Sequence, residues 1–313
     1  MTNQWSNFWA QGHVTTFGNF FSEGYSGVVG AWLDQVADRY EDDALVVDMG
    51  CGNCAVLTHL LGRDKRLHYI GIDSADVVIN KEAKENLKRS ASTAKLLSPV
   101  PAEATGLDQY SIDAVISIYG IEYADLSQAS AEIGRICKPA ANINFLMHHT
   151  HSQISEMSSR ALREFKGQEI DEVLGCLALI SERAEAVGLQ TLKFDDQAES
   201  ARLQINHYAA HYLNDREFAT ANITMFEFMT SVLKFFKLMR ASRAERTRFI
   251  DALKSEYESY FARFKQMLEA SLDREEVDTF RAQLETQGFV IETLKPLLDQ
   301  ENILAWELSG FRK

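Results

Sequence analysis

The chain has 313 residues, of which 46% are hydrophobic and 25% are charged, a composition typical of a globular protein with a buried core. Its formal net charge of −13 argues against a nucleic-acid partner, because phosphate contacts need clustered lysine and arginine side chains. The first residues lack the basic and apolar regions of a signal peptide, and no apolar run reaches the roughly 20 residues of a membrane span, so the sequence predicts a cytoplasmic protein.

Residues 44–55 read as a buried strand that runs into a glycine turn and then into a helix. Gly50 and Gly52 would let the turn bend and let a ligand approach the backbone closely. Their spacing fits a nicotinamide dinucleotide as well as S-adenosylmethionine. Asp48 favours S-adenosylmethionine, because a carboxylate at the end of the strand would repel a pyrophosphate and attract the ammonium group of an amino-acid moiety.

Three further segments read as strands or their approaches. Residues 67–73 form a strand that ends in Asp73, whose carboxylate could hold the two hydroxyl groups of a ribose. Residues 111–118 form another largely apolar run, the fourth strand when the weak run over 95–97 is counted as the third, and residues 142–147 form the fifth after a helix and turn over 131–139. Parallel sheets hold ligands at the carboxyl ends of their strands, so the residues that follow these runs should face one crevice.

In this order, the segments resemble the motifs of the class I S-adenosylmethionine-dependent methyltransferases, whose first motif has the form Asp-x-Gly-x-Gly and whose second strand ends in an acid. The resemblance covers residues 44–149. It implies an α/β fold with a Rossmann-like, doubly wound sheet, mostly parallel, that ends in a C-terminal antiparallel hairpin. Two positions depart from the family pattern: Cys54 stands where a third glycine is common, and Pro101 stands where an acid is common.

The resemblance also implies the residues that contact S-adenosylmethionine. It assigns the cofactor to the first loop, the second strand, the loop after Pro101 and the end of the fourth strand, that is, to Asp48, Gly50, Gly52, Asp73, Ala102, Glu103 and Tyr119. It places residues 1–43 over the cleft as a helical lid, in which aromatic side chains would exclude water and glycines would give mobility. We expect Tyr25 from this lid, and Glu122 and Tyr123 from the fourth strand's exit, to contact the methyl acceptor.

Met147–His151 brings three histidines to the same crevice. Such a cluster indicates either a general base that works near neutral pH or a metal site. His207 and His211 stand four residues apart on a predicted helix and could help to chelate zinc only if they met the first group in space. We predict that His148 or His149 is the base and that no metal binds.

Residues 152–278 read as helices, where the family pattern has a short connection. Residues 225–239 are apolar on more than one face, which predicts burial on several sides in a helical core, a homodimer interface or an apolar acceptor pocket. Residues 279–313 read as a helix and two strands. The predicted organisation is therefore a lid (1–43), a cofactor-binding core (44–151), a helical insertion or cap (152–278) and a C-terminal helix and hairpin that complete the core (279–313).

We predict a methyltransferase that acts on an O or N atom of a small or medium organic acceptor under the helical cap. Methyl transfer is a direct displacement, so the protein mainly aligns the reactants and removes a proton where the acceptor has one to lose. Two alternatives stay open. One is an S-adenosylmethionine-binding regulatory or assembly protein that transfers nothing, and the other is a nicotinamide-dependent oxidoreductase.

Overall fold

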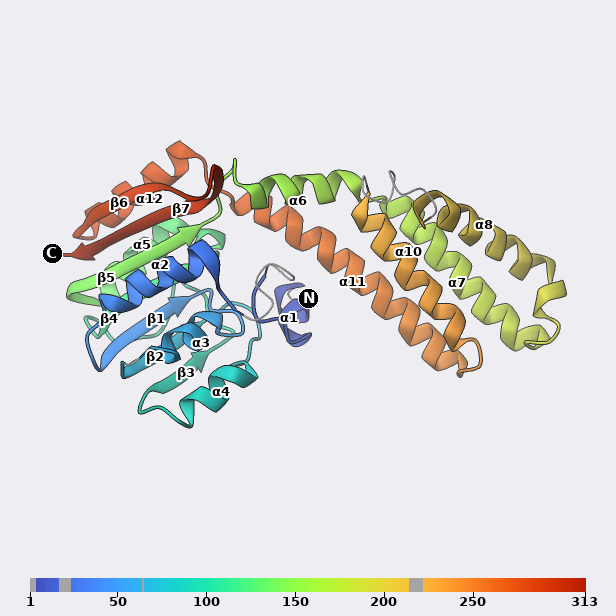
Figure 1. The fold of residues 1–313 in the computed structure, drawn as a ribbon, viewed down its shortest axis with the longest axis horizontal. Helices are drawn as coiled ribbons and strands as arrows, with labels where there is room; N and C mark the ends of the chain where they lie inside the picture. Colours follow the sequence, from blue (N-terminus) through green and yellow to red (C-terminus); the bar gives the residue numbers. More distant parts are fainter. Residues whose placement is uncertain (1–3, 17–23, 64, 214–221) are drawn as a thin grey trace. The chain divides into compact units, whose positions relative to one another are not determined.

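The computed structural model describes residues 4–16, 24–63, 65–213 and 222–313 (Figure 1). The chain divides into two units: unit 1 comprises residues 1–156 and 266–313, and unit 2 comprises residues 157–265. Unit 2 falls inside the segment 152–278 for which the sequence predicts helices. Residues 17–23 of the predicted lid lie outside the described residues.

A seven-stranded sheet forms the core of unit 1, in the order β3-β2-β1-β4-β5-β7-β6. Neighbouring strands are parallel up to β5, and β7 pairs antiparallel with both β5 and β6. The strands are β1 (Ala44–Met49), β2 (Leu67–Ile72), β3 (Thr93–Leu97), β4 (Ile112–Ile118), β5 (Cys137–Met147), β6 (Phe289–Asp299) and β7 (Asn302–Arg312). This topology confirms the predicted doubly wound sheet with its closing hairpin.

Helices cover both faces of the sheet, as the continuous apolar strands require. One face carries α2 (Gly27–Asp38) and α3 (Ala55–Leu61), and Trp32, Leu33 and Val36 of α2 are buried there. The other face carries α5 (Leu126–Ile136) and α12 (Arg274–Thr286), whose apolar residues join a second buried cluster. The remaining helices of this unit are α1 (Gln4–Ala10), α4 (Lys81–Leu87) and the 3-10 turn η2 (Ile121–Tyr123).

The fifth strand begins earlier than the sequence predicts. The sequence predicts a helix and turn over 131–139 and a strand from Asn142, but β5 starts at Cys137 and contains Pro139. The register between β4 and β5 shifts between Ile112 and Ala114. Because proline has no N–H to donate, it is tolerated where a ladder is interrupted in this way.

Unit 2 is helical. It contains α7 (Gly167–Val187), α8 (Asp196–Leu213), α10 (Ile223–Phe235) and the 3-10 turns η3 (Leu192–Phe194) and η4 (Phe236–Leu238), and α6 (Gln153–Glu164) and α11 (Arg243–Ala270) lead into and out of it. The side chains of Met225, Phe228, Val232 and Phe235 are fully buried in its core and lie on one face of α10. Ile223, Phe226 and Leu233 on its other side are exposed, so the predicted burial on several sides is wrong.

A buried arginine ties the helices of unit 2 together. The Arg246 side chain is 2% exposed, and its Nε donates to Ser181 Oγ at 2.9 Å while its other nitrogens bond to the carbonyl oxygens of Met239 and Ala241 and to Glu185. Met239 and Ala241 lie in the turn between η4 and α11, and Ser181 and Glu185 lie on α7. The guanidinium therefore satisfies backbone groups that would otherwise be buried without a donor.

We expect Arg246→Met to lower the free energy of unfolding by about 2–4 kcal/mol, because several acceptors lose their donor at once. Urea titration followed by circular dichroism measures this change. Lys254→Met, at a half-exposed position of the same helix, is the matched control and should change the free energy of unfolding by less than about 0.5 kcal/mol. Equal unfolding of the two variants would contradict this account.

Candidate cofactor and active site

A cleft of about 220 Å³ opens at the carboxyl ends of the parallel strands, beside the point where the strand order reverses. It continues past Trp9, Thr16 and Tyr119 into a narrow inner pocket of about 20 Å³ beside Asp48. The residues predicted to contact the cofactor all line one of these two cavities: Asp48, Gly50, Gly52, Asp73, Ala102, Glu103 and Tyr119. The structure therefore brings together residues that are up to 71 positions apart in the sequence, from Asp48 to Tyr119.

In the loop between β1 and α3, each of the two glycines lies so close to a neighbouring residue that a side chain would clash. Gly50 (φ 76°) and Gly52 (φ 48°) both have left-handed backbones, which favour glycine. A Cβ on Gly50 would lie 2.5 Å from the Cα of Gly120, in the loop after β4. A Cβ on Gly52 would lie 2.5 Å from the indole ring of Trp9. The glycine loop thus lies directly against the fourth strand's exit and the N-terminal segment.

We expect Gly52→Ala to lower the free energy of unfolding by about 2–4 kcal/mol, since it adds left-handed strain to a clash with an indole ring. Thermal unfolding followed by calorimetry checks this. Gly175→Ala is the matched control, because Gly175 lies within a helix and an added Cβ would meet nothing within 4 Å. That control should unfold at or above the wild-type temperature, and a Gly52→Ala protein that did the same would refute the contact with Trp9.

Two acids stand at opposite ends of the glycine loop. Asp73 accepts hydrogen bonds from the N–H groups of Gly52 and Ala75, each at 2.8 Å, and burial raises the pKa of its carboxyl group. Asp48 is 1% exposed and its Oδ2 accepts from Tyr69 Oη at 2.6 Å. Its Oδ1 has no hydrogen-bond partner among the described residues. Burial raises the pKa of Asp48 to about 7, and the nearby Asp73 adds to this rise.

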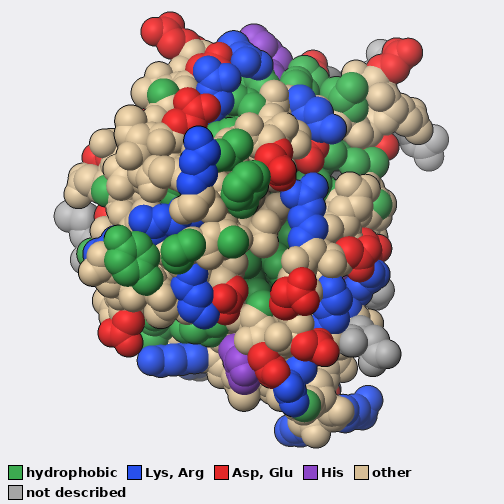
Figure 2. All heavy atoms as spheres, turned by 90° about the vertical axis from the view of Figure 1, so that its left-hand side faces the viewer, with side chains coloured by type: hydrophobic (Ala, Val, Ile, Leu, Met, Phe, Trp, Pro, Cys, Tyr) green, Lys and Arg blue, Asp and Glu red, His purple; other side chains and the backbone are tan. Residues whose placement is uncertain are grey.

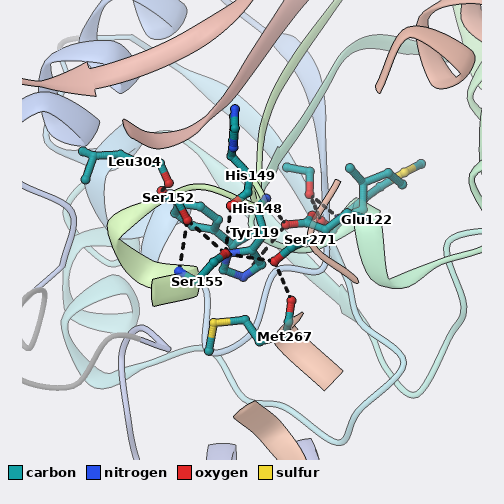
Figure 3. Close-up of polar contacts among 12 residues, drawn as sticks. Tyr119, Glu122, His148, His149, Ser152, Ser155, Met267, Ser271 and Leu304 are labelled. Carbon is teal, nitrogen blue, oxygen red and sulfur yellow. Dashed lines mark hydrogen bonds and ion pairs between the residues drawn. The ribbon is translucent and has the colours of Figure 1, made fainter. Parts of the chain in front are cut away.

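A buried carboxyl and imidazole lie behind the wall of the cleft (Figure 3). Glu122 Oε1 accepts the backbone N–H of His148 at 2.8 Å and lies 4.0 Å from its Nε2. Burial raises the pKa of Glu122 to about 8 and lowers that of His148 to about 3. The imidazole is therefore neutral at pH 7, and the carboxyl is mostly protonated.

Tyr119 and Tyr123 stand between this buried pair and the cleft. Both tyrosines line the cleft, whereas His148 and Glu122 do not. The imidazole of His148 contacts both phenol rings, with ring centroids 4.6 Å from Tyr119 and 5.9 Å from Tyr123. The predicted base His148 therefore does not line the cleft itself, and the two tyrosines that it contacts separate it from the cleft. Tyr25, predicted to contact the acceptor, lines the inner pocket beside Asp48.

The structure separates the two histidines that the sequence placed together. The ring of His149 stacks on Trp306 at 4.3 Å and lines a different groove, of about 430 Å³, with His151 and Arg274. Its Nδ1 accepts from the N–H of His151, and Ser155 Oγ donates to its carbonyl oxygen (Figure 3). Successive residues at a strand end point to opposite sides, which is why only His148 lies behind the cleft.

Sequence reasoning missed two polar side chains at this site. Tyr69, on β2, donates to Asp48, and Asn53, in the glycine loop, bonds to the backbone of the N-terminal segment. The sequence could have indicated Tyr69 by its place on the strand that pairs with the strand of Asp48. For Asn53, the sequence offers only its position directly after Gly52.

Three further findings concern metal ions, membrane-spanning helices and surface charge. In the parts of the chain that the structure describes, no three His, Cys, Asp or Glu side chains converge to hold a metal ion. None of the described helices combines the length and apolar character that a membrane crossing requires. On the face shown in Figure 2, basic and acidic side chains are interspersed among the described residues, so this face presents no broad field of one sign.

Comparisons with known proteins were informative for the core of unit 1. A family model described as "Methyltransferase domain" matches residues 47–145. The comparison with curated proteins gave no match.

Similar solved structures include the cyclase SpnF (20% identity, TM-score 0.35) and geranyl diphosphate C-methyltransferase from Streptomyces coelicolor A3(2) (17%, 0.32). They cover 44% and 38% of this chain, and the chain covers 50% and 44% of theirs. A protein from Bordetella parapertussis, described as an exported protein, matches over 90% of this chain and 66% of its own, at 12% identity and a TM-score of 0.40. At these values, the likeness says nothing about substrate or reaction.

The residues of the cleft fit the cofactor of this family. S-adenosylmethionine carries an ammonium group, which suits the buried and unpaired Oδ1 of Asp48, and a ribose, which suits the carboxylate of Asp73. The glycine loop between them lets a ligand lie against the backbone. Residues 47–145 thus match a methyltransferase domain, and the cleft that they help to form fits S-adenosylmethionine as the cofactor.

Proposed function

We propose that this protein transfers a methyl group from S-adenosylmethionine to an O or N atom of a small or medium organic acceptor. The observation that carries the proposal is the pair of acids along one glycine loop, with Asp48 buried at the inner end of the cleft and Asp73 at the outer end. When bound, the cofactor supplies an electrophilic methyl group. The protein's own residues would hold its two polar ends and exclude water.

Aromatic side chains supply the water-excluding wall. Trp5, Trp9, Tyr119 and Tyr123 line the cleft, and Trp5 contacts Tyr123 edge to face at 5.5 Å. Rings of this kind suit a planar or apolar acceptor and a positively charged sulfonium group. Where the acceptor has a proton to lose, we propose that it passes toward the neutral imidazole of His148, which becomes an effective base only when the Glu122 carboxyl beside it ionises.

The nicotinamide alternative fits the cleft less well. A nicotinamide dinucleotide would need room for a second ring and a site for a pyrophosphate, but the inner pocket is narrow and is lined by the Asp48 carboxyl group. A binding protein without transfer activity would hold the same cofactor, so the transfer assay below decides between that alternative and the proposal. A capping role for the helical insertion, a homodimer through it and a cytoplasmic location stay predictions from the sequence.

Calorimetric titration of the wild-type protein with S-adenosylmethionine and S-adenosylhomocysteine is the direct test. We expect micromolar binding of both and no binding of NAD or NADH at the same concentrations. A screen of phenols, amines and carboxylic acids with methyl-labelled cofactor would then identify the acceptor class. Binding of NADH in place of S-adenosylmethionine would overturn the proposal, and tight binding without transfer to any acceptor would favour a regulatory role.

A further inference from the structure

Asn53 joins three segments that are distant in the sequence. It lies in the glycine loop and is 2% exposed. Its Nδ2 donates to the carbonyl oxygens of Trp9, at 2.9 Å, and His13, at 2.8 Å. Its Oδ1 accepts the backbone N–H of Val78 at 3.0 Å. Both N–H bonds of the amide are used on the N-terminal segment, so a carboxylate or an aliphatic side chain could not replace it.

The segment that Asn53 holds forms part of the cofactor cleft. Trp9 lines both the outer cleft and the inner pocket, and its indole ring lies against Gly52, next to Asn53 in the chain. Trp9 lies in the last turn of α1, and its carbonyl oxygen also accepts the N–H of Gly12 at 3.0 Å, whereas His13 follows the helix. The ring of Phe8 stacks on His13 at 4.2 Å, which keeps this turn folded on itself.

Two other contacts hold the segment at its start. The Ser6 Oγ accepts the N–H of Asp76 at 2.9 Å, and Trp5 Nε1 donates to Gln266 Oε1 at 2.8 Å. Ser6 is partly exposed and its bond competes with water, whereas Asn53 is enclosed. Asn53 is therefore a buried polar link between the N-terminal segment and the glycine loop.

We propose that Asn53 is a positioning residue that holds residues 4–16 against the glycine loop, so that Trp9 completes the cofactor cleft. Without the amide, the two hydrogen bonds that tie Trp9 and His13 to the glycine loop would be lost, and the segment would open far more often. Asn53 acts on the ligand through Trp9 and does not itself line either cavity. By linkage, a ligand that binds between the loop and Trp9 must in turn stabilise the closed segment.

The proposal rests on the proposed function only for its cofactor readout. Hydrogen exchange of residues 4–16 in the ligand-free protein tests the attachment itself. We expect exchange in these residues to be about tenfold faster or more in Asn53→Ala and in the isosteric Asn53→Asp, while the strands of the sheet keep their wild-type protection. Asn80→Ala is the matched control. Asn80 bonds to the same loop, through the carbonyl oxygens of Asn53 and Cys54, but no described bond joins it to the N-terminal segment.

A double-mutant cycle with Trp9→Ala, measured as the affinity for S-adenosylmethionine, tests the action through Trp9. We expect each single variant to weaken binding by about tenfold or more, and Asn53→Ala to add less than about threefold in the Trp9→Ala background. Unchanged exchange in both Asn53 variants, or additive effects in the cycle, would overturn the proposal. If the wild type did not bind S-adenosylmethionine, the proposed function would fail while the exchange result still decided the role of Asn53.

Discussion

Asp73→Ala is expected to weaken S-adenosylmethionine binding by at least about tenfold, or roughly 1.4 kcal/mol. Two effects add. The ribose loses a charged hydrogen-bond acceptor, and the N–H groups of Gly52 and Ala75 lose the carboxylate that holds the glycine loop against β2. Calorimetric titration of wild type and variant with the same cofactor stock measures the change.

Two further variants separate these effects. Asp73→Asn keeps one carbonyl oxygen for a backbone N–H but loses the charge and one acceptor, so its affinity should fall between those of the wild type and Asp73→Ala. Asp76→Ala removes an exposed acid three residues away and should bind as the wild type does. Wild-type affinity in Asp73→Ala would show that the ribose lies elsewhere, and the assignment of the cleft would then be wrong.

Acidification below pH 7 is expected to weaken S-adenosylmethionine binding, by up to about tenfold for each pH unit. Burial raises the pKa of Asp48 to about 7 in the free protein, and the carboxylate form is the one that attracts the ammonium group. The bound ammonium lowers this pKa, so binding releases a proton wherever the free carboxyl is protonated. Affinity is therefore full above pH 7 and is lost as the pH falls through this value. Titrations from pH 5.5 to 8.5 measure the slope.

The number of protons released gives an independent check. At pH 6, titrations in buffers of different ionisation enthalpy should report close to one proton released for each cofactor bound. In Asp48→Asn, binding should be weak at every pH and the proton release should disappear. Asp73 and Glu122 also have raised pKa values, so a pH dependence that persisted in Asp48→Asn would assign the titration to one of these groups instead.

Local patterns in the sequence were enough to predict the sheet and the cofactor end of the cleft. The apolar run before Asp48 and the spacing of Gly50 and Gly52 express constraints that act within a dozen residues: burial of a strand on both faces and a left-handed turn. Asp73 could be placed beside them because parallel strands bring their carboxyl ends to one edge. The same reasoning predicted that residues 152–278 are helical, since helical periodicity is a local property, but it did not predict that α10 leaves Phe226 and Leu233 exposed.

Contacts between distant residues decided the rest. His148 and His149 are neighbours in the chain, yet the ring of His148 contacts Tyr119 and the ring of His149 stacks on Trp306. The chain leaving β5 points the two side chains to opposite sides, and each side packs against a different part of the fold. The early start of β5 depends on its register with β4.

The attachment of the N-terminal segment depends on Asn53, whose partner Trp9 lies 44 residues earlier in the chain. No periodicity or motif encodes such a bond. The sequence by itself thus determined the fold and indicated the residues that we propose to hold S-adenosylmethionine. Only the tertiary structure decided which side chains stand behind the cleft and which bonds attach the N-terminal segment, because hydrogen bonds and burial at this site join residues that chain order keeps apart.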